Sequence, residues 1–139
     1  MPKYRGSEGK LVPASEAKKI TGLYQNRKDH KEKPDFNYVE AEFFGLEKFQ
    51  QLLRECGGKP VGFRVYYGFR HEDHSGLEPI EATGEKGGKN TPRLVIIPVD
   101  AQGADLTGAV RVGGMKDDAE EEGGNALIGG PLCPKHCGN

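Results

Sequence analysis

The stretch VGFRVYYGFR, residues 61–70, decides the fold that the sequence predicts. Apolar residues alternate with polar residues or glycine along it, which is the period of a half-buried β-strand. We expect its apolar face, with Phe63 and Val65, to lie in the core, and the strand to be central in any sheet. The opposite face carries two glycines and three polar side chains, Arg64, Tyr66 and Arg70.

That opposite face is a candidate interaction surface. Tyrosine and arginine anchor many protein interfaces, and they would equally hold an anionic ligand. The alternative is an ordinary exposed strand face, on which the arginine stems cover apolar surface. We therefore single out Arg64, Tyr66 and Arg70 and keep both interpretations.

Two helices are expected before this strand. Residues 45–58, GLEKFQQLLRECGG, place five apolar residues on one stripe and end at a pair of glycines that is typical of a C-terminal cap. The stripe comprises Leu46, Phe49, Leu52, Leu53 and Cys56. We expect Cys56 to be buried, because a thiol there behaves as a small hydrophobe. Residues 13–31 predict an earlier helix, and residues 36–44 predict extended chain or a linker.

Two more strands are expected after it. Residues 93–100, RLVIIPVD, predict the second strand, and residues 107–114, TGAVRVGG, a short third one. The elements together predict a two-layer α+β domain over residues 13–112, with one or two helices packed on a small antiparallel sheet. We expect a flexible N-terminus at 1–12, an acidic linker at 113–123 and a cysteine-containing tail at 124–139.

The overall composition excludes some classes of partner. The chain has 139 residues, which is the size of one domain. Its formal net charge is −1, so it lacks the positive field that nucleic-acid-binding proteins use to attract phosphates. No apolar run approaches the length of about 18 residues needed to span a membrane, and the N-terminus lacks an apolar signal core. We expect a cytoplasmic protein that binds neither nucleic acid nor membranes.

The tail gathers residues that bind metals or form disulfides. Cys133, His136 and Cys137 lie at i, i+3 and i+4, and His71, His74 or Cys56 would complete a tetrahedral zinc site with them. A disulfide between Cys133 and Cys137 and a pair of free thiols are the alternatives. The apolar residues of the tail predict that it docks on its own domain, on a second copy or around a metal: Ala126, Leu127, Ile128 and Leu132.

The segment after the first strand holds the only candidate catalytic groups, His71, Glu72, Asp73 and His74. A strand end often holds catalytic residues, but a charged cluster is also typical of a solvated turn. The sequence contains no nucleophile elbow, no zinc-protease helix motif and no phosphate loop. These observations favour a protein that is not an enzyme.

Four segments carry a family resemblance: AEFFGLEKFQQLL, GKPVGFRVYYGF, RLVIIPVDAQGADL and PLCPKHC. Their order resembles a family of small uncharacterised proteins of Bacteroidetes-type bacteria, which place a helix, a GxRxYYG strand, a VDxxGxDL turn and a Leu-Cys-Pro tail in the same order. The resemblance covers Thr21–Leu106 and Leu132–Cys137, and it implies a bacterial protein without implying an activity.

From these observations we expect a small bacterial interaction or accessory protein, with a protein partner or with self-association. The alternative is a metal-dependent hydrolase or redox protein that uses the HEDH segment, residues 71–74, and the CPKHC segment, residues 133–137.

Overall fold

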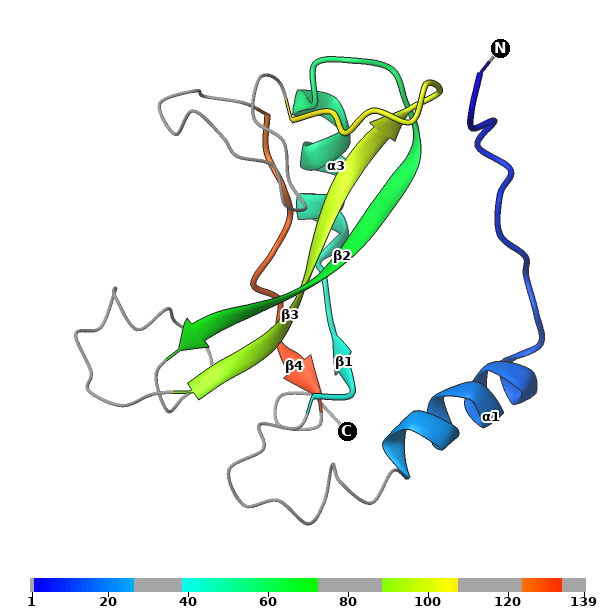
Figure 1. Ribbon diagram of the computed structural model, residues 1–139, viewed down its shortest axis with the longest axis vertical. Coiled ribbons are helices and arrows are strands. Elements are labelled where there is room, and N and C mark those ends of the chain that lie inside the picture. Colours follow the sequence, from blue (N-terminus) through cyan, green and yellow to red (C-terminus); the bar gives the residue numbers. More distant parts are fainter. Residues whose placement is uncertain (1, 27–38, 73–88, 108–123, 134–139) are drawn as a thin grey trace. The chain divides into compact units, whose positions relative to one another are not determined.

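The computed structural model describes residues 2–26, 39–72, 89–107 and 124–133. Its elements follow the order α1, β1, α3, β2, β3 and β4 (Figure 1). The strands form two small antiparallel sheets of two strands each, β2 with β3 and β1 with β4. The predicted α+β class is confirmed, whereas the single sheet that we expected is replaced by two.

The chain divides into two compact units that share the long hairpin. The first unit comprises Met1–Glu8, Phe44–Gly68 and Arg93–Gly130, and the second comprises Gly9–Phe43, Phe69–Pro92 and Pro131–Asn139. The hairpin strands are β2, Pro60–Glu72, and β3, Lys89–Asp100, and they extend the two strands expected from the sequence. Each unit therefore contains half of the hairpin.

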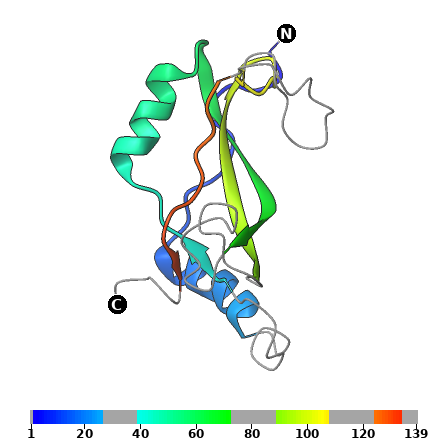
Figure 2. The ribbon, with the colours of Figure 1, turned by 90° about the vertical axis from the view of Figure 1, so that its left-hand side faces the viewer.

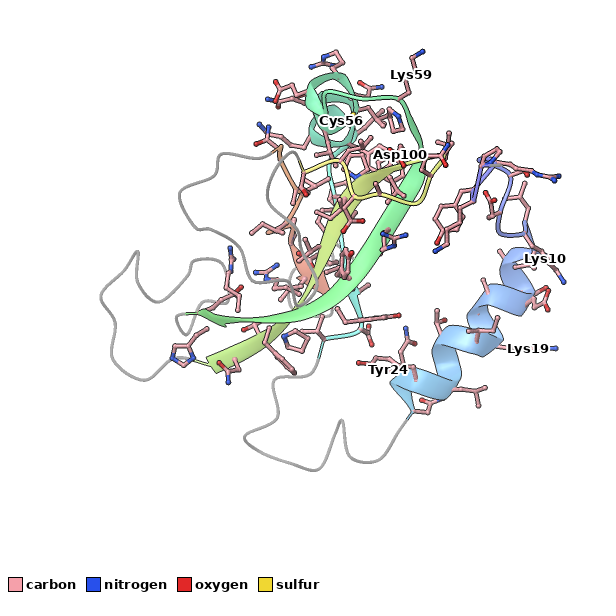
Figure 3. All side chains as sticks on the ribbon, turned by 45° about the horizontal axis from the view of Figure 1, so that its top comes forward. Lys10, Lys19, Tyr24, Cys56, Lys59 and Asp100 are labelled. Atoms are coloured by element: carbon pink, nitrogen blue, oxygen red, sulfur yellow. The ribbon has the colours of Figure 1, made fainter. Side chains whose placement is uncertain are left out.

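The core of the first unit lies where α3, Leu46–Glu55, meets the hairpin. Phe49 of α3 packs on Phe63 of β2, with 4.3 Å between ring centroids. Cys56 is buried, as predicted, and its thiol donates to the carbonyl of Leu53. Figure 3 labels Cys56 at the end of α3, where Gly57 takes the left-handed backbone conformation expected of a helix cap. The buried apolar residues among those described in this unit are Leu52, Cys56, Ile96, Ile97, Pro98 and Val99.

The second unit contains α1, Ala14–Gln25, and the short strands β1, Ala41–Glu42, and β4, Leu132–Cys133. Ala41 lies opposite Cys133 and Glu42 opposite Leu132 in the antiparallel pair. Helix α1 forms within the segment in which the sequence predicts a helix. It buries none of its side chains, so it does not act as a helical layer over a sheet.

The tail docks on the chain itself. Leu127 and Ile96 exchange both backbone hydrogen bonds, each 3.0 Å long, in the first unit. Arg93, which is almost fully buried, donates to the carbonyl of Gly130 over 2.6 Å. Figure 2 shows this part of the tail running alongside β3. Within the second unit, β4 buries Leu132, so the predicted docking of the tail is confirmed and its target is its own chain.

The predicted faces of β2 are wrong beyond Arg64. Val65 is 47% exposed, Tyr67 92% and Phe69 76%, whereas the residues that alternate with them are more buried. Phe63 keeps its expected apolar contact, with α3. The physical reason is that α3 covers only the beginning of this face, while internal partners hold the polar side chains of the other face.

Two expected segments fall outside the described residues. The predicted third strand, residues 107–114, retains only Thr107, which is buried and not in a strand. The predicted linker, residues 113–123, is wholly outside them. Among the described helices, none is both long and apolar enough to cross a membrane.

Candidate functional site

A polar cluster in the first unit centres on Asp105, which follows the hairpin. Its Oδ1 forms a salt bridge with Nη1 of Arg64 at 2.5 Å, and its Oδ2 accepts a hydrogen bond from the hydroxyl of Tyr66. Nη2 of Arg64 also donates to the hydroxyl of Tyr4 at 3.2 Å and to the carbonyl of Gly103 at 3.3 Å. Arg64 and Tyr66, two of the predicted interaction residues, therefore make contacts within the chain.

Hydrogen bonds in this cluster stabilise the protonated forms of both side chains. The pKa of Arg64 is raised, chiefly by its hydrogen bond with Tyr4 and then by that with Tyr66, so it stays a cation. The pKa of Tyr66 is raised above its usual 10.0, first because its hydroxyl donates to Asp105 and second because it is partly buried. Asp105 thus faces a fixed cation and a neutral phenol.

The turn between Asp100 and Asp105 holds this cluster in place. Oδ1 of Asp100 accepts from the backbone N–H groups of Gln102 and Ala104, both at 2.9 Å. Gly103 has a φ of 87°, and a Cβ there would lie 2.8 Å from the side chain of Lys3. Figure 3 labels Asp100 at the end of β3, where this turn begins. Local hydrogen bonding therefore positions the Asp105 carboxylate beside β2.

The N-terminal segment closes one side of the cluster. The backbone N–H groups of Lys3 and Tyr4 both donate to the carbonyl of Ala101, at 2.8 and 3.0 Å. The guanidinium of Arg64 lies 5.8 Å from the ring centroid of Tyr4. No motif in the first residues of the chain indicated this arrangement, because it depends on contacts with a turn that is distant in sequence.

The third predicted interaction residue, Arg70, belongs to the second unit. Its Nε lies 2.5 Å from Oε2 of Glu72, whose side chain is fully buried. The charged side chains on this face of β2 are therefore paired with carboxylates inside the chain. Arg64, Tyr66 and Arg70 do share one strand face, as expected, but each is engaged with its own fold.

The opposite face of β2 presents apolar side chains to solvent. In the first unit, Val65 and Tyr67 are well exposed, and neither carries a formal charge. No described residue outside the hairpin donates or accepts a backbone hydrogen bond with β2 between Val61 and Tyr67. By contrast, β3 pairs with β2 on one edge and, at Ile96, with Leu127 of the tail as well. Among the described residues, β2 thus combines an edge without a further backbone partner and an exposed apolar row, Val65 and Tyr67.

The residues proposed from the sequence as metal ligands are only partly described. Cys133 lies in β4 and is disulfide-bonded, and Nδ1 of His71 lies 3.0 Å from Oδ1 of Asn90. His74, His136 and Cys137 lie outside the described residues. Within the described part of the chain, no three His, Cys, Asp or Glu side chains are arranged to hold a metal ion. A sulfur in a disulfide does not ligate zinc, so zinc binding by Cys133 requires its reduction.

The candidate catalytic residues are also only partly described, and the structure does not bring the described ones together. His71 is exposed, Glu72 is buried against Arg70, and Asp73 and His74 lie outside the described residues. The two described side chains alternate along β2 and so point to opposite faces of the strand.

Comparison with family models, with curated proteins and with solved structures gives no match to this chain.

Proposed function

We propose that this chain is a small bacterial interaction protein that binds an extended segment of a partner protein along the edge of β2 with which no described segment pairs. The observation that carries the proposal is the exposed, uncharged row of Val65 and Tyr67 on that strand. Exposed apolar and aromatic side chains on a strand face are typical of binding surfaces rather than of solvated ones. The resemblance described in the sequence analysis supports the bacterial part of the proposal.

The arrangement of the hairpin favours strand addition as the binding mode. A strand with an open edge offers unpaired N–H and C=O groups, and proteins normally protect such edges with charge, proline or a covering segment. Leu127 gives β3 such a neighbour, whereas β2 carries no charge or proline from Val65 to Gly68. A partner strand would add backbone hydrogen bonds there, and its side chains would contact the apolar row.

The charges of β2 specify the chemistry of the partner. Arg64 and Arg70 point to the other face and are neutralised by Asp105 and Glu72. The surface left for a partner is uncharged, so it would select an apolar segment without charges opposite Val65 and Tyr67. Burying a partner charge there would cost free energy, because these two side chains offer no opposite charge.

A defined probe tests this function. A fluorescein-labelled peptide of about ten residues, with valine and threonine alternating, should raise its fluorescence anisotropy on binding the full chain. The variant carrying Val65→Ser and Tyr67→Ser should bind about tenfold more weakly or not at all. The matched control Glu47→Ser, on the exposed start of α3, should bind like the natural chain.

Backbone methylation separates strand addition from nonspecific apolar binding. The same peptide with N-methyl groups on alternate residues keeps its side chains but loses the donors that pair with a strand edge. Equal binding of the methylated peptide would contradict strand addition. A second copy of the chain is the other molecule that could cover this edge, and sedimentation velocity without peptide tests for it. A stable dimer that the Tyr67→Ser change dissociates would show that a second copy occupies the edge.

One observation favours the alternative redox function, namely the disulfide of Cys133. Disulfides persist in oxidising compartments, whereas the cytoplasmic location that we propose from the sequence would keep this cysteine reduced. Mass spectrometry of protein that is alkylated during cell lysis distinguishes the two states. Alkylated Cys133 supports the cytoplasmic protein, and an intact disulfide supports an oxidising location or a redox role.

A further inference from the structure

The first unit contains a cavity of about 320 Å³ between the N-terminal segment and the start of β2. Its walls include a carboxylate, a guanidinium, a glycine and apolar side chains, all from described residues of one unit. A volume at the lower end of the range for ligand sites suits a small molecule rather than a peptide. The lining residues are Tyr4, Gly6, Glu8, Val61, Gly62, Phe63, Arg64 and Val99.

Arg64 supplies the positive wall of this cavity. A guanidinium has five N–H donors, and the contacts to Asp105, Tyr4 and Gly103 use three of them. These three hydrogen bonds leave other N–H groups of the guanidinium for a ligand. The side chain is 31% exposed, and its partners fix the orientation of the guanidinium. Arg64 therefore contributes an oriented cation to the lining of the cavity.

Glu8 supplies the negative wall. Its two carboxylate oxygens accept backbone N–H groups of Arg5 and Gly6, each at 2.8 Å. These bonds, that from Arg5 first, lower the pKa of Glu8 below its usual 4.5, so the carboxylate is charged at neutral pH. A carboxylate has about four acceptor positions, so Glu8 retains acceptor capacity for a ligand. Gly6, with a φ of 94°, brings this loop against β2, because a Cβ there would lie 3.0 Å from the carbonyl oxygen of Val61.

Gly62 keeps the cavity open between these two charges. No atom lies within 4 Å of the position that a Cβ on Gly62 would take. Gly62 and Arg64 also share one face of β2, because side chains alternate along a strand. Val61, Phe63 and Val99 make the remaining lining apolar. The cavity thus offers a cation, an anion and an apolar surface to one small ligand.

From this arrangement we propose that the cavity binds a free α-amino acid with a small apolar side chain. The ligand carboxylate would accept a hydrogen bond from the guanidinium of Arg64, and its ammonium would donate to Glu8. Its side chain would lie against Val99 and the neighbouring apolar lining. A ligand with a carboxylate but no ammonium would leave the charge of Glu8 unpaired and would be repelled by it. The ligand therefore needs both charges. This inference is independent of strand addition at the edge of β2.

Calorimetry with L-leucine and two single-charge analogues tests the proposal on the full chain. We expect L-leucine to bind with a dissociation constant of about 0.1 to 1 mM, and N-acetyl-leucine and leucine amide to bind at least about fivefold more weakly. Glu8→Gln should weaken the binding of leucine and strengthen that of N-acetyl-leucine, so that the two ligands bind this variant about equally. Gly62→Val should abolish binding by filling the cavity, and Glu47→Gln should change nothing.

Several results would overturn the proposal. They are the absence of binding at about 10 mM leucine, equal binding of N-acetyl-leucine and leucine, and full binding by the Gly62→Val variant. Circular dichroism establishes whether each variant is folded. If Gly62→Val does not fold, the exposed Glu8→Gln variant and the two analogues still decide the outcome.

Discussion

Arg64 in β2 and Asp105 in the turn after β3 form a salt bridge across 41 residues of sequence. The same carboxylate accepts the hydroxyl of Tyr66, so one acidic residue binds two polar side chains of the strand. Both side chains lie on the same strand face, and their attachment to Asp105 turns that face towards the protein. The apolar row at Val65 and Tyr67 is therefore directed to solvent.

Removing the Asp105 carboxylate should destabilise the fold. Asp105→Ala leaves Arg64 and Tyr66 without a common acceptor in a part-buried site, and we expect the free energy of unfolding to fall by about 2 kcal/mol. Urea unfolding followed by circular dichroism measures the change. Glu47→Ala, on the exposed start of α3, is the matched control. Equal stability of the Asp105→Ala variant and the natural chain would contradict the role of this salt bridge.

Stability should fall at high pH because of Tyr66. Its raised pKa means that the folded protein holds the phenol proton more tightly than the unfolded chain does. The stabilisation is complete below the ordinary pKa of 10.0 and is lost as the pH rises through the raised value. Urea midpoints measured from neutral pH into this range should decline less steeply for Tyr66→Phe than for the natural chain. Parallel declines would show that Tyr66 does not contribute.

The covered and the uncovered part of the apolar face of β2 should respond differently to truncation. Phe63→Ala removes the ring that packs on Phe49, and we expect a loss of about 3 kcal/mol. Tyr67→Ala removes a ring that is 92% exposed, and we expect a change of no more than about 0.5 kcal/mol. Thermal unfolding of both variants provides the measurement. A larger loss for Tyr67→Ala than for Phe63→Ala would contradict the finding that α3 covers the start of this face and leaves the rest exposed.

The tail offers a similar comparison. Leu132 is 6% exposed in β4, so Leu132→Ala should cost about 2 kcal/mol or more, whereas Ile128, 47% exposed, should tolerate alanine. Deleting residues 124–139 should lower the melting temperature further, because it also removes the pairing of Leu127 with Ile96. If this deletion leaves the melting temperature unchanged, the docked tail has no structural role.

The elements with local signals could be predicted from the sequence. The period of Phe49, Leu52 and Cys56 and the glycine after them predicted α3 and its end, because these depend on helix geometry and capping. The alternation in β2 likewise predicted a strand. Alternation does not say which face is covered, and here the usual preference for an apolar buried face gave the wrong answer after Arg64.

The parts that escaped prediction depend on contacts distant in sequence. Asp105 and Tyr4 meet Arg64 only after the hairpin forms, and no pattern near any of them indicates the others. The pairing of β1 with β4 joins two strands of two residues each, too short to show a period. The candidate residues in strands could thus be identified from the sequence, but their partners could not.

Hydroxyl-radical footprinting of the natural chain tests the central claim most directly, namely that β2 turns its apolar face outward to bind a strand. Mass spectrometry would give the oxidation rates of Tyr66 and Tyr67, adjacent residues of one type, with and without the valine–threonine peptide. We predict that Tyr67 is oxidised faster in the free chain and is protected when the peptide binds, while Tyr66 changes little. Faster oxidation of Tyr66, or no protection of Tyr67 by the bound peptide, would contradict the account.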